Sequence, residues 1–335
     1  MSAAAPLGVL LSLVFPGLGQ GLAGKRKRML AWAVGSTVPT LAIAVSVWFV
    51  PVMLLARLAS AIDAYLCLQR STERRWVDAA AAFFLDVVLL VCVRLFAVEG
   101  FKIPSSSMYP TLIIGDHIFV DKVSLAWHAP ERGEVVVFTQ PCSQHTFVKR
   151  VIARGGDTVE VRCSQVYVNG KHATSTLVSP KATYQDRDEA SGRWYARETS
   201  RYREQLGNRA YDTFHDVGRP SGDAAAARGD FPSRERMFAP SCAKGGAFFD
   251  SKDPPSAQPV GRIVETKPET AEPCEPQAHF EVPPGTLFMM GDNRNNANDS
   301  RYWGVVREDA VIGRVTGIWL SDGLEGGWSR FGALE

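Results

Sequence analysis

The chain has 335 residues, a formal net charge of +2 at pH 7 and 46% hydrophobic residues. Its length exceeds what one hydrophobic core usually organises, and the small charge, with no nucleic-acid-binding motif, argues against a nucleic-acid partner. The first hundred residues are strongly apolar, whereas 180–276 is polar and rich in Arg, Asp, Gly and Pro. We therefore expect a membrane part followed by a soluble region.

Four apolar segments near the N-terminus each approach the ~20 residues that a helix needs to cross a bilayer. The third is the weakest candidate because Arg57 and Asp63 interrupt it, and a re-entrant or interfacial helix is its alternative. The N-terminus lacks the basic region of a cleavable signal peptide. The predicted segments are 5–23, 29–49, 51–68 and 79–97.

Clusters of basic residues predict the orientation of these segments. The run Lys-Arg-Lys-Arg at 25–28 separates the first two segments, and Arg70, Arg74 and Arg75 separate the third from the fourth. Short loops rich in Lys and Arg remain in the cytoplasm. The fourth segment therefore runs outward, and the chain after Gly100 is expected on the outer side of the membrane.

The soluble region has the pattern of short strands with frequent turns. Asn169-Gly170 suits a type I′ turn and predicts a hairpin. No alternation of strands and helices is visible, which favours a mainly antiparallel β fold. The polar stretch after Pro180 has the composition of an insertion. Strands are predicted at 135–138, 147–152, 158–161, 166–168, 279–282, 286–290 and 310–320.

The predicted fold class is mainly β. An antiparallel β domain, interrupted by a smaller inserted β-rich domain, follows N-terminal transmembrane helices. The expected boundaries are 1–99 for the membrane anchor, 100–179 and 278–335 for the two parts of the larger β domain, and 180–277 for the insertion.

Four cysteines fall in the expected outer region, where disulfides persist. They are Cys142, Cys163, Cys242 and Cys274. Four cysteines allow three pairings, and the sequence does not choose among them.

Two patterns that suggest ligand binding are weak. G-x-G-x-x-G at 19–24 lies in an apolar segment without a preceding strand, so close glycine packing between membrane helices explains it better. Cys142 and His145 are too few ligands for a metal site, and no H-E-x-x-H motif is present. We expect neither a metal nor another cofactor.

The strongest chemical signal combines a serine cluster with a lysine in an apolar strand. The segment 101–112 places Ser105, Ser106 and Ser107 between two prolines. In the strand-like run at 145–151, Lys149 shares its face with apolar neighbours. An ordinary loop and an edge-strand lysine that blocks aggregation are the alternatives.

A serine hydroxyl is a weak nucleophile that requires an adjacent base. A lysine can be that base only when its amine is neutral, and its ordinary pKa is near 10.4. Burial among apolar side chains lowers a lysine pKa by up to about 3–5 units. The two segments together therefore predict a Ser-Lys nucleophile and base.

These segments resemble type I signal (leader) peptidases. The run 94–112 resembles the end of the membrane anchor and the nucleophile segment of that family. Three further boxes follow in the family's order: 115–122, 132–138 with 148–150 and 156–157, and 291–304. The polar insertion is similar to the extra β domain of larger family members.

The resemblance implies a role for each matching residue. Ser107 is the implied nucleophile, Lys149 the general base, and Ser105 a partner of the Ser107 backbone N–H in an oxyanion hole. Phe101, Ile103, Met108, Leu112, Phe147 and Val148 match positions that bind the substrate. Gly291, Asp292 and Asn293 match a supporting turn, and Asp299 and Arg301 a supporting ion pair. Asp116 and Asp121 are interpreted as turn and surface residues.

Three features depart from the family pattern. Ala297 stands where many relatives carry a serine that hydrogen-bonds the lysine, so Lys149 must be oriented by another group. Asn295 replaces a common aspartate. The first two apolar segments exceed the two-span anchor usual in the family.

The resemblance implies a membrane-bound serine endopeptidase that removes signal peptides from exported preproteins after small residues, at an A-x-A type site. The expected partners are preprotein signal peptides and the lipid bilayer, with the protein export machinery as a further candidate. The expected location is the bacterial inner membrane, multi-pass, with the catalytic domain on the periplasmic face. The alternatives are a non-catalytic module that binds signal peptides and a different Ser-Lys protease.

Overall fold

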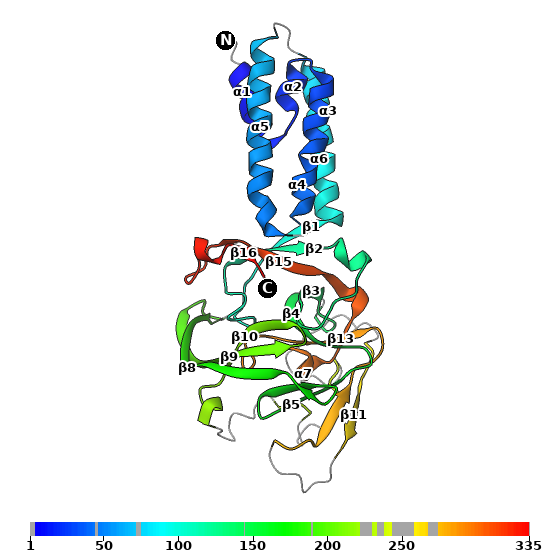
Figure 1. The fold of residues 1–335 in the computed structure, drawn as a ribbon, viewed down its shortest axis with the longest axis vertical. Coiled ribbons are helices and arrows are strands. Elements are labelled where there is room, and N and C mark those ends of the chain that lie inside the picture. The colour runs from blue at the N-terminus through cyan, green and yellow to red at the C-terminus, as the bar shows by residue number, and fades with distance from the viewer. Residues whose placement is uncertain are drawn as a thin grey trace. The chain divides into compact units, whose positions relative to one another are not determined.

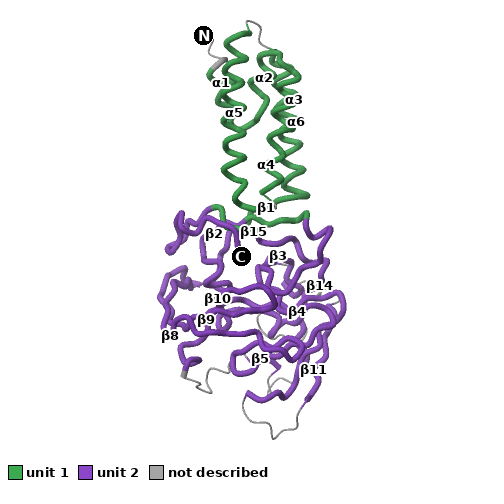
Figure 2. Tube along the Cα trace, in the orientation of Figure 1, with its two compact units in different colours: residues 1–101, 119–123, 316–319 green, residues 102–118, 124–315, 320–335 purple. Residues whose placement is uncertain are grey.

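The computed structural model divides into two compact units, shown in Figure 2. The first comprises residues 1–101, 119–123 and 316–319, and the second comprises 102–118, 124–315 and 320–335. The residues that the structure describes are 4–43, 46–71, 75–143, 145–188, 190–221, 230–232, 238–242, 258–266 and 274–334.

The first unit is a bundle of helices that lie alongside one another (Figure 1). α1 packs against α5, and the short α2 packs against both α5 and α6. The helices are α1 (Ala4–Val14), α2 (Leu18–Leu22), α3 (Arg26–Gly35), α4 (Thr37–Ala42), the 3-10 turn η1 (Val47–Phe49), α5 (Val50–Gln69) and α6 (Trp76–Phe96), followed by the strand β1 (Val98–Lys102).

Two stretches of the described chain are long and apolar enough to cross a bilayer, Val47–Gln69 and Trp76–Phe96. The first two predicted segments are instead divided into shorter helices. One division lies after Val14, where Gly17 adopts a φ of 100°, and another lies at Ser36 between α3 and α4. The expectation that the third segment is the weakest span is wrong, because α5 is continuous.

The two charges that seemed to interrupt α5 are instead hydrogen-bonded to the broken segments. Arg57 Nη1 donates to the carbonyl of Val14 at 2.5 Å, where α1 ends and its carbonyls lack helical partners. Asp63 accepts from Trp32 Nε1 at 2.9 Å and from Gln20 Nε2 at 3.1 Å. Such internal partners are required wherever backbone and side-chain polar groups lie within lipid.

The glycines at 19–24 pack closely against neighbouring helices, as predicted. A Cβ added to Gly19 would lie 2.6 Å from Ala64 Cβ of α5. One added to Gly21 would lie 2.8 Å from the Asp78 carbonyl oxygen of α6. Larger residues at these positions would force the helices apart.

The second unit contains antiparallel sheets, which confirms the predicted fold class. In the sheet that carries the predicted site, the order is β15 (Val311–Ser321), β3 (Val135–Thr139), β4 (Thr146–Arg154), β13 (Thr286–Met290) and β14 (Val306–Arg307). A second sheet has the order β11 (Arg262–Glu265), β12 (Ala278–Glu281), β5 (Thr158–Arg162), β6 (Gln165–Val168) and β7 (Lys171–His172). A third consists of β10 (Arg209–His215), β9 (Trp194–Leu206) and β8 (Thr174–Arg187).

Short elements complete the description. They are the strands β2 (Asp116–Asp121) and β16 (Gly332–Ala333), the helix α7 (Ser300–Trp303), and the 3-10 turns η2 (Ser124–Ala126), η3 (Arg219–Ser221), η5 (Glu308–Ala310) and η6 (Trp328–Arg330).

The predicted hairpin is confirmed. β6 pairs with β7 in antiparallel register, and both turn residues, Asn169 and Gly170, have positive φ angles of 53° and 71°. These are the conformations that a type I′ turn requires.

The third sheet bears on the predicted insertion at 180–277. β8 starts at Thr174 and runs across the expected boundary near 180. Phe214 of β10 forms a parallel bridge with Asn293, in the last motif box. The inserted domain as a separate body stays a prediction, and its stretches 222–229, 233–237, 243–257 and 267–273 lie outside the described residues.

The structure selects one of the three possible cysteine pairings. Cys142 is bonded to Cys242, and Cys163 is bonded to Cys274. Each bond joins two residues far apart in the chain, with sequence separations of 100 and 111.

A buried ion pair links β9 to the last motif box. Arg294 Nη2 lies 2.6 Å from Glu204 Oε1, and their side chains are 3% and 1% exposed. Tyr211 donates a further hydrogen bond to Glu204 at 2.6 Å. Removing one charge of such a pair leaves the other buried without compensation, which typically costs about 3–5 kcal/mol.

We expect Glu204→Gln to lower the thermal unfolding midpoint of the second unit by about 6–12 °C, because a loss of about 3 kcal/mol shifts a domain of this size by that much. Tryptophan fluorescence of the full chain in detergent micelles measures the midpoint. Glu198→Gln is the matched control, since Glu198 pairs with Lys181 on the exposed surface and should change nothing. Equal midpoints for the two variants would contradict the prediction.

Candidate functional site

The loop that carries Ser107 is fixed at both ends by main-chain hydrogen bonds. Ile103 N donates to the Asp116 carbonyl at 2.8 Å, and Leu112 N donates to the Met108 carbonyl at 3.0 Å. The side chains of Ile103, Met108 and Leu112 are buried. These three apolar residues therefore anchor the loop, while Ser105 and Ser107 are half-buried.

Lys149 lies on β4, where it pairs with Val136 of β3. Its Nζ lies 2.8 Å from Ser107 Oγ and donates to the Val148 carbonyl at 3.0 Å. The hydroxyl oxygens of Ser105 and Ser107 are 3.3 Å apart. Ser105, Ser107 and Lys149, widely separated in sequence, are thus brought together as the sequence predicts.

Burial makes the Lys149 amine a weaker base than an exposed lysine. Lys149 is 3% exposed, and the Phe147 ring lies 5.4 Å from its Nζ. Desolvation lowers the pKa of Lys149 to about 8, although the carboxylates of Asp299 and Asp292 act in the opposite direction. A substantial fraction of the amine is therefore neutral at mildly alkaline pH.

Asp292, predicted as a supporting residue, is buried in a hydrogen-bonded group. Arg150 binds it with two nitrogens, at 2.8 Å and 2.5 Å, and Thr111 Oγ1 donates to it at 2.5 Å. Sequence reasoning missed Arg150 and Thr111. The signal for Arg150 was available, because a second charged residue beside Lys149 in the same apolar strand also requires a buried partner.

Asp299 and Arg301 form the predicted ion pair. Arg301 Nε and Nη2 each lie 2.8 Å from an oxygen of Asp299. Asp299 also accepts from the backbone N–H of Arg301 at the start of α7 and from that of Gly291. The ion pair therefore ties α7 to the turn at 291–293.

That turn packs directly against the Ser107 loop. Asn293 N donates to the Ser107 carbonyl at 3.2 Å. A Cβ added to Gly291 would lie 2.4 Å from Ala297 Cβ and 2.5 Å from the Ser107 carbonyl oxygen. Any larger residue at 291 would displace the loop. Ala297 has no hydroxyl to hold the lysine. The Lys149 amine instead donates to the Val148 carbonyl, and this second contact helps to orient it toward Ser107.

The remaining predicted substrate-binding residues lie on two strands. Phe147 and Val148 are half-buried on β4, next to Lys149. Phe101 is half-buried on β1 and belongs to the first compact unit.

Asp116 and Asp121, interpreted as turn and surface residues, do not lie on the surface, although Asp116 does close a turn with Ile113. Asp116 is fully buried and binds Arg330 at 2.7 Å and Ser321 at 2.6 Å. Asp121 is 7% exposed and accepts from the Val123 backbone N–H at 2.8 Å. Asp116 thus satisfies donors from the end of the chain, whose position the sequence alone does not reveal, whereas the Val123 donor of Asp121 is local.

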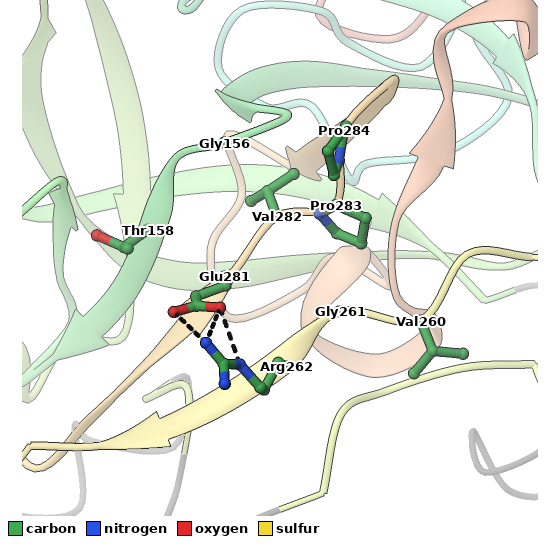
Figure 3. A pocket seen from close by; sticks show the side chains of 9 residues that line it. All are labelled: Gly156, Thr158, Val260, Gly261, Arg262, Glu281, Val282, Pro283 and Pro284. Carbon is green, nitrogen blue, oxygen red and sulfur yellow. Dashed lines mark hydrogen bonds and ion pairs between the residues drawn. The ribbon is translucent and has the colours of Figure 1, made fainter.

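A separate pocket lies on the second sheet and contains none of the predicted site residues (Figure 3). An exposed ion pair between Arg262 and Glu281 crosses one side of it. Among the residues that the structure describes, no group of three or more His, Cys, Asp or Glu side chains could hold a metal ion. The pocket is lined by Gly156, Thr158, Val260, Gly261, Arg262, Glu281, Val282, Pro283 and Pro284.

Residues 75–320 match the family model described as signal peptidase, peptidase S26. The chain belongs to this family. It is 29% identical over 249 residues to the signal peptidase I of Aquifex aeolicus (strain VF5), covering 71% of this chain and 82% of that relative. It is 25% identical over 283 residues to the signal peptidase I of Pseudomonas fluorescens, covering 77% and 78%.

Among solved structures, a signal peptidase I from Enterococcus faecalis V583 aligns with 56% of this chain and 98% of its own chain. The TM-score is 0.25 at 18% identity. The family assignment confirms the resemblance in the sequence motifs. The chain is accordingly a serine endopeptidase of a membrane-anchored signal peptidase family.

We expect the Lys149 amine to titrate with a midpoint of about 8, since burial opposes its charging. NMR of the full chain labelled at lysine Cε measures this midpoint, and Lys149→Arg identifies the signal by its disappearance. An exposed lysine such as Lys181 should titrate above its ordinary value instead, because Glu198 raises its pKa. A Lys149 midpoint at 10 or higher would contradict the geometry of a desolvated amine.

Proposed function

We propose that this chain removes N-terminal signal peptides from exported preproteins by an acyl-enzyme mechanism, with Ser107 as nucleophile and Lys149 as general base. The observation that carries the proposal is the 2.8 Å contact between the Ser107 hydroxyl and a buried, readily deprotonated lysine amine. A nucleophile and base within hydrogen-bonding distance, with the base oriented by a third group, form the arrangement that activates a serine.

In the acylation step, Ser107 Oγ attacks the scissile carbonyl carbon while its proton moves to the neutral Lys149 amine. The resulting ammonium gives that proton to the leaving amine, so the peptide bond breaks and an ester to Ser107 remains. Water then attacks the ester as Lys149 again accepts a proton. Release of the signal peptide carboxylate regenerates the Ser107 hydroxyl.

The tetrahedral oxyanion requires hydrogen-bond donors that are already in place. We assign this role to the Ser107 backbone N–H and the Ser105 hydroxyl. The half-buried position of Ser105, 3.3 Å from Ser107 Oγ, supports the assignment. Loss of one such donor typically costs about 10²–10³ in kcat.

We propose cleavage after small residues, at an A-x-A type site, and the apolar residues around Ser107 and Lys149 support this proposal. Ile103, Met108 and Leu112 pack the Ser107 loop, and Phe147 and Val148 flank Lys149 on β4. We propose that these residues shape shallow apolar subsites for the substrate; a substrate-binding role for Phe101, which belongs to the first unit, stays a prediction. Gly291, Asp292, Asn293, Asp299 and Arg301 support the dyad from beneath rather than react.

We further propose a multi-pass anchor in the bacterial inner membrane, with the catalytic residues on the periplasmic face. Two continuous apolar helices, the run of basic residues at 25–28 and two disulfides support this topology, since disulfides persist in oxidising compartments. The substrate's apolar segment could then remain in the bilayer during cleavage, with the export machinery delivering it.

Ser107→Ala and Lys149→Met should each abolish cleavage of a model preprotein, because neither the nucleophile nor its base has a substitute. The assay uses the full chain in detergent micelles, with membrane insertion of each variant checked by carbonate extraction. Wild-type rates in either variant would refute the Ser-Lys mechanism. An inert wild-type protein that still binds signal peptides would favour a non-catalytic binding module.

The pH dependence follows from the lowered pKa of Lys149. Since only the neutral amine accepts the serine proton, kcat/KM should rise about tenfold per pH unit below 8 and level off above that value. The assay is cleavage of the same preprotein between pH 6 and pH 10. A flat profile across this range would exclude Lys149 as the titrating base.

A further inference from the structure

Ser106, between the two half-buried serines, points to a different set of partners. It is 5% exposed and donates to Asp186 Oδ1 at 2.6 Å. It also accepts from Asn296 Nδ2 at 2.9 Å. The hydroxyls of Ser105 and Ser107 contact each other instead. The middle serine therefore fixes the loop rather than facing the dyad.

Asn296 is itself held in one orientation. Its Oδ1 accepts from Arg197 Nη1 at 2.7 Å, and its Nδ2 lies 3.0 Å from Asp186 Oδ2 and 3.2 Å from the Tyr184 hydroxyl. Because the amide oxygen and nitrogen have different partners, a flipped amide would lose these hydrogen bonds. Asn296 thus connects β8 and β9 to the last motif box.

The Asp186 carboxylate is surrounded by donors. Oδ1 accepts from Ser106 Oγ and from the Arg187 backbone N–H, while Oδ2 accepts from Arg197, Asn296 and Tyr195. Burial favours a raised pKa for Asp186, but the hydrogen bonds from Ser106 and Arg197 hold it below its ordinary value. The carboxylate therefore remains charged, with both oxygens engaged, at every pH at which the enzyme would work.

The same region also holds the main chain of the loop. Asn293 Nδ2 donates to the Ser106 carbonyl at 3.0 Å and to the Tyr184 hydroxyl at 2.8 Å. The Tyr109 hydroxyl donates to the Gln185 carbonyl at 3.2 Å. Side chain and backbone on both sides of Ser107 are thus bound by residues 184–186 of β8 and by the last motif box.

We propose that Asp186 and Asn296 are positioning residues for Ser107, acting through the Ser106 side chain. The inference rests on the proposed function, because it takes Ser107 as the nucleophile. Displacing a reacting atom by about 1 Å can cost 10²-fold in rate even when binding is intact. A loop held at Ser106 keeps Ser107 Oγ at its distance from Lys149 and keeps the Ser107 N–H in place.

The test compares Ser106→Ala, Asp186→Asn and the double variant in preprotein cleavage by the full chain in detergent micelles. Both oxygens of the Asp186 carboxylate accept hydrogen bonds, Oδ1 from the Arg187 N–H and Oδ2 from Arg197. In Asp186→Asn, the NH₂ group that replaces one of these oxygens would therefore face a donor and could not accept. We expect each single variant to lower kcat about 10- to 100-fold with KM unchanged within about twofold. The double variant should be no slower than the slower single variant, since both act through one contact.

Two further readouts separate positioning from other causes. The midpoint of the kcat/KM profile, set by Lys149, should stay near its wild-type value in Ser106→Ala. Asp188→Asn is the matched control, because Asp188 lies two residues beyond Asp186 and binds Ser191 on the exposed surface. It should cleave at the wild-type rate.

Wild-type kcat in Ser106→Ala or Asp186→Asn would overturn the inference, as would fully additive losses or a shifted pH midpoint. A loss of rate that matches a loss of thermal stability would also overturn it, by assigning a structural role. These failures are distinct from that of the proposed function. If Ser107→Ala is inert while Ser106→Ala is unimpaired, only the positioning role fails.

Discussion

The removal of one lysine amine from water is the constraint on which the site depends. A pKa of about 8 in place of 10.5 corresponds to roughly 3 kcal/mol of disfavoured charging. A charged, hydrated lysine would be more stable than this buried amine, so the packing of the rest of the domain must supply the free energy that keeps Lys149 buried. The apolar strand β4, Phe147 and the half-buried Ser107 loop together keep the amine desolvated.

The acids near Lys149 would cancel this effect if they were free to pair with it. Asp292 is instead bound by Arg150, and Asp299 is bound by Arg301. A third buried pair, Glu204 with Arg294, joins the same motif box to β9. The arginines thus neutralise carboxylates that are needed to hold the 291–301 segment together. Charged residues can therefore surround the Lys149 amine without keeping it permanently protonated.

The contact between Ser107 and Lys149, and the strands that surround it, could be predicted from the sequence, because both produce local patterns: a lysine in an apolar run, and β-branched residues between turn signals. The sequence did not predict partners that meet only after folding. Arg57 and Asp63 looked like interruptions of a span, yet Arg57 binds the Val14 carbonyl at the end of α1 and Asp63 binds Gln20 of α2 and Trp32 of α3. Asp116 and the Ser106–Asp186 contact were missed for the same reason, since a buried carboxylate and an exposed one are identical in sequence.

The support for Ser107 comes largely from the end of the chain, and this has a consequence for biosynthesis. Asn293 and Gly291 contact the loop, and β13 pairs with β4, so a nascent chain that stops before residue 286 lacks these supports although it contains both members of the dyad. Under the proposed topology, the chain must be translocated from about residue 100 through the segment at 286–301 before the protease becomes competent. A newly made enzyme would therefore be unable to attack neighbouring nascent chains, or itself, while it is still being threaded through the membrane.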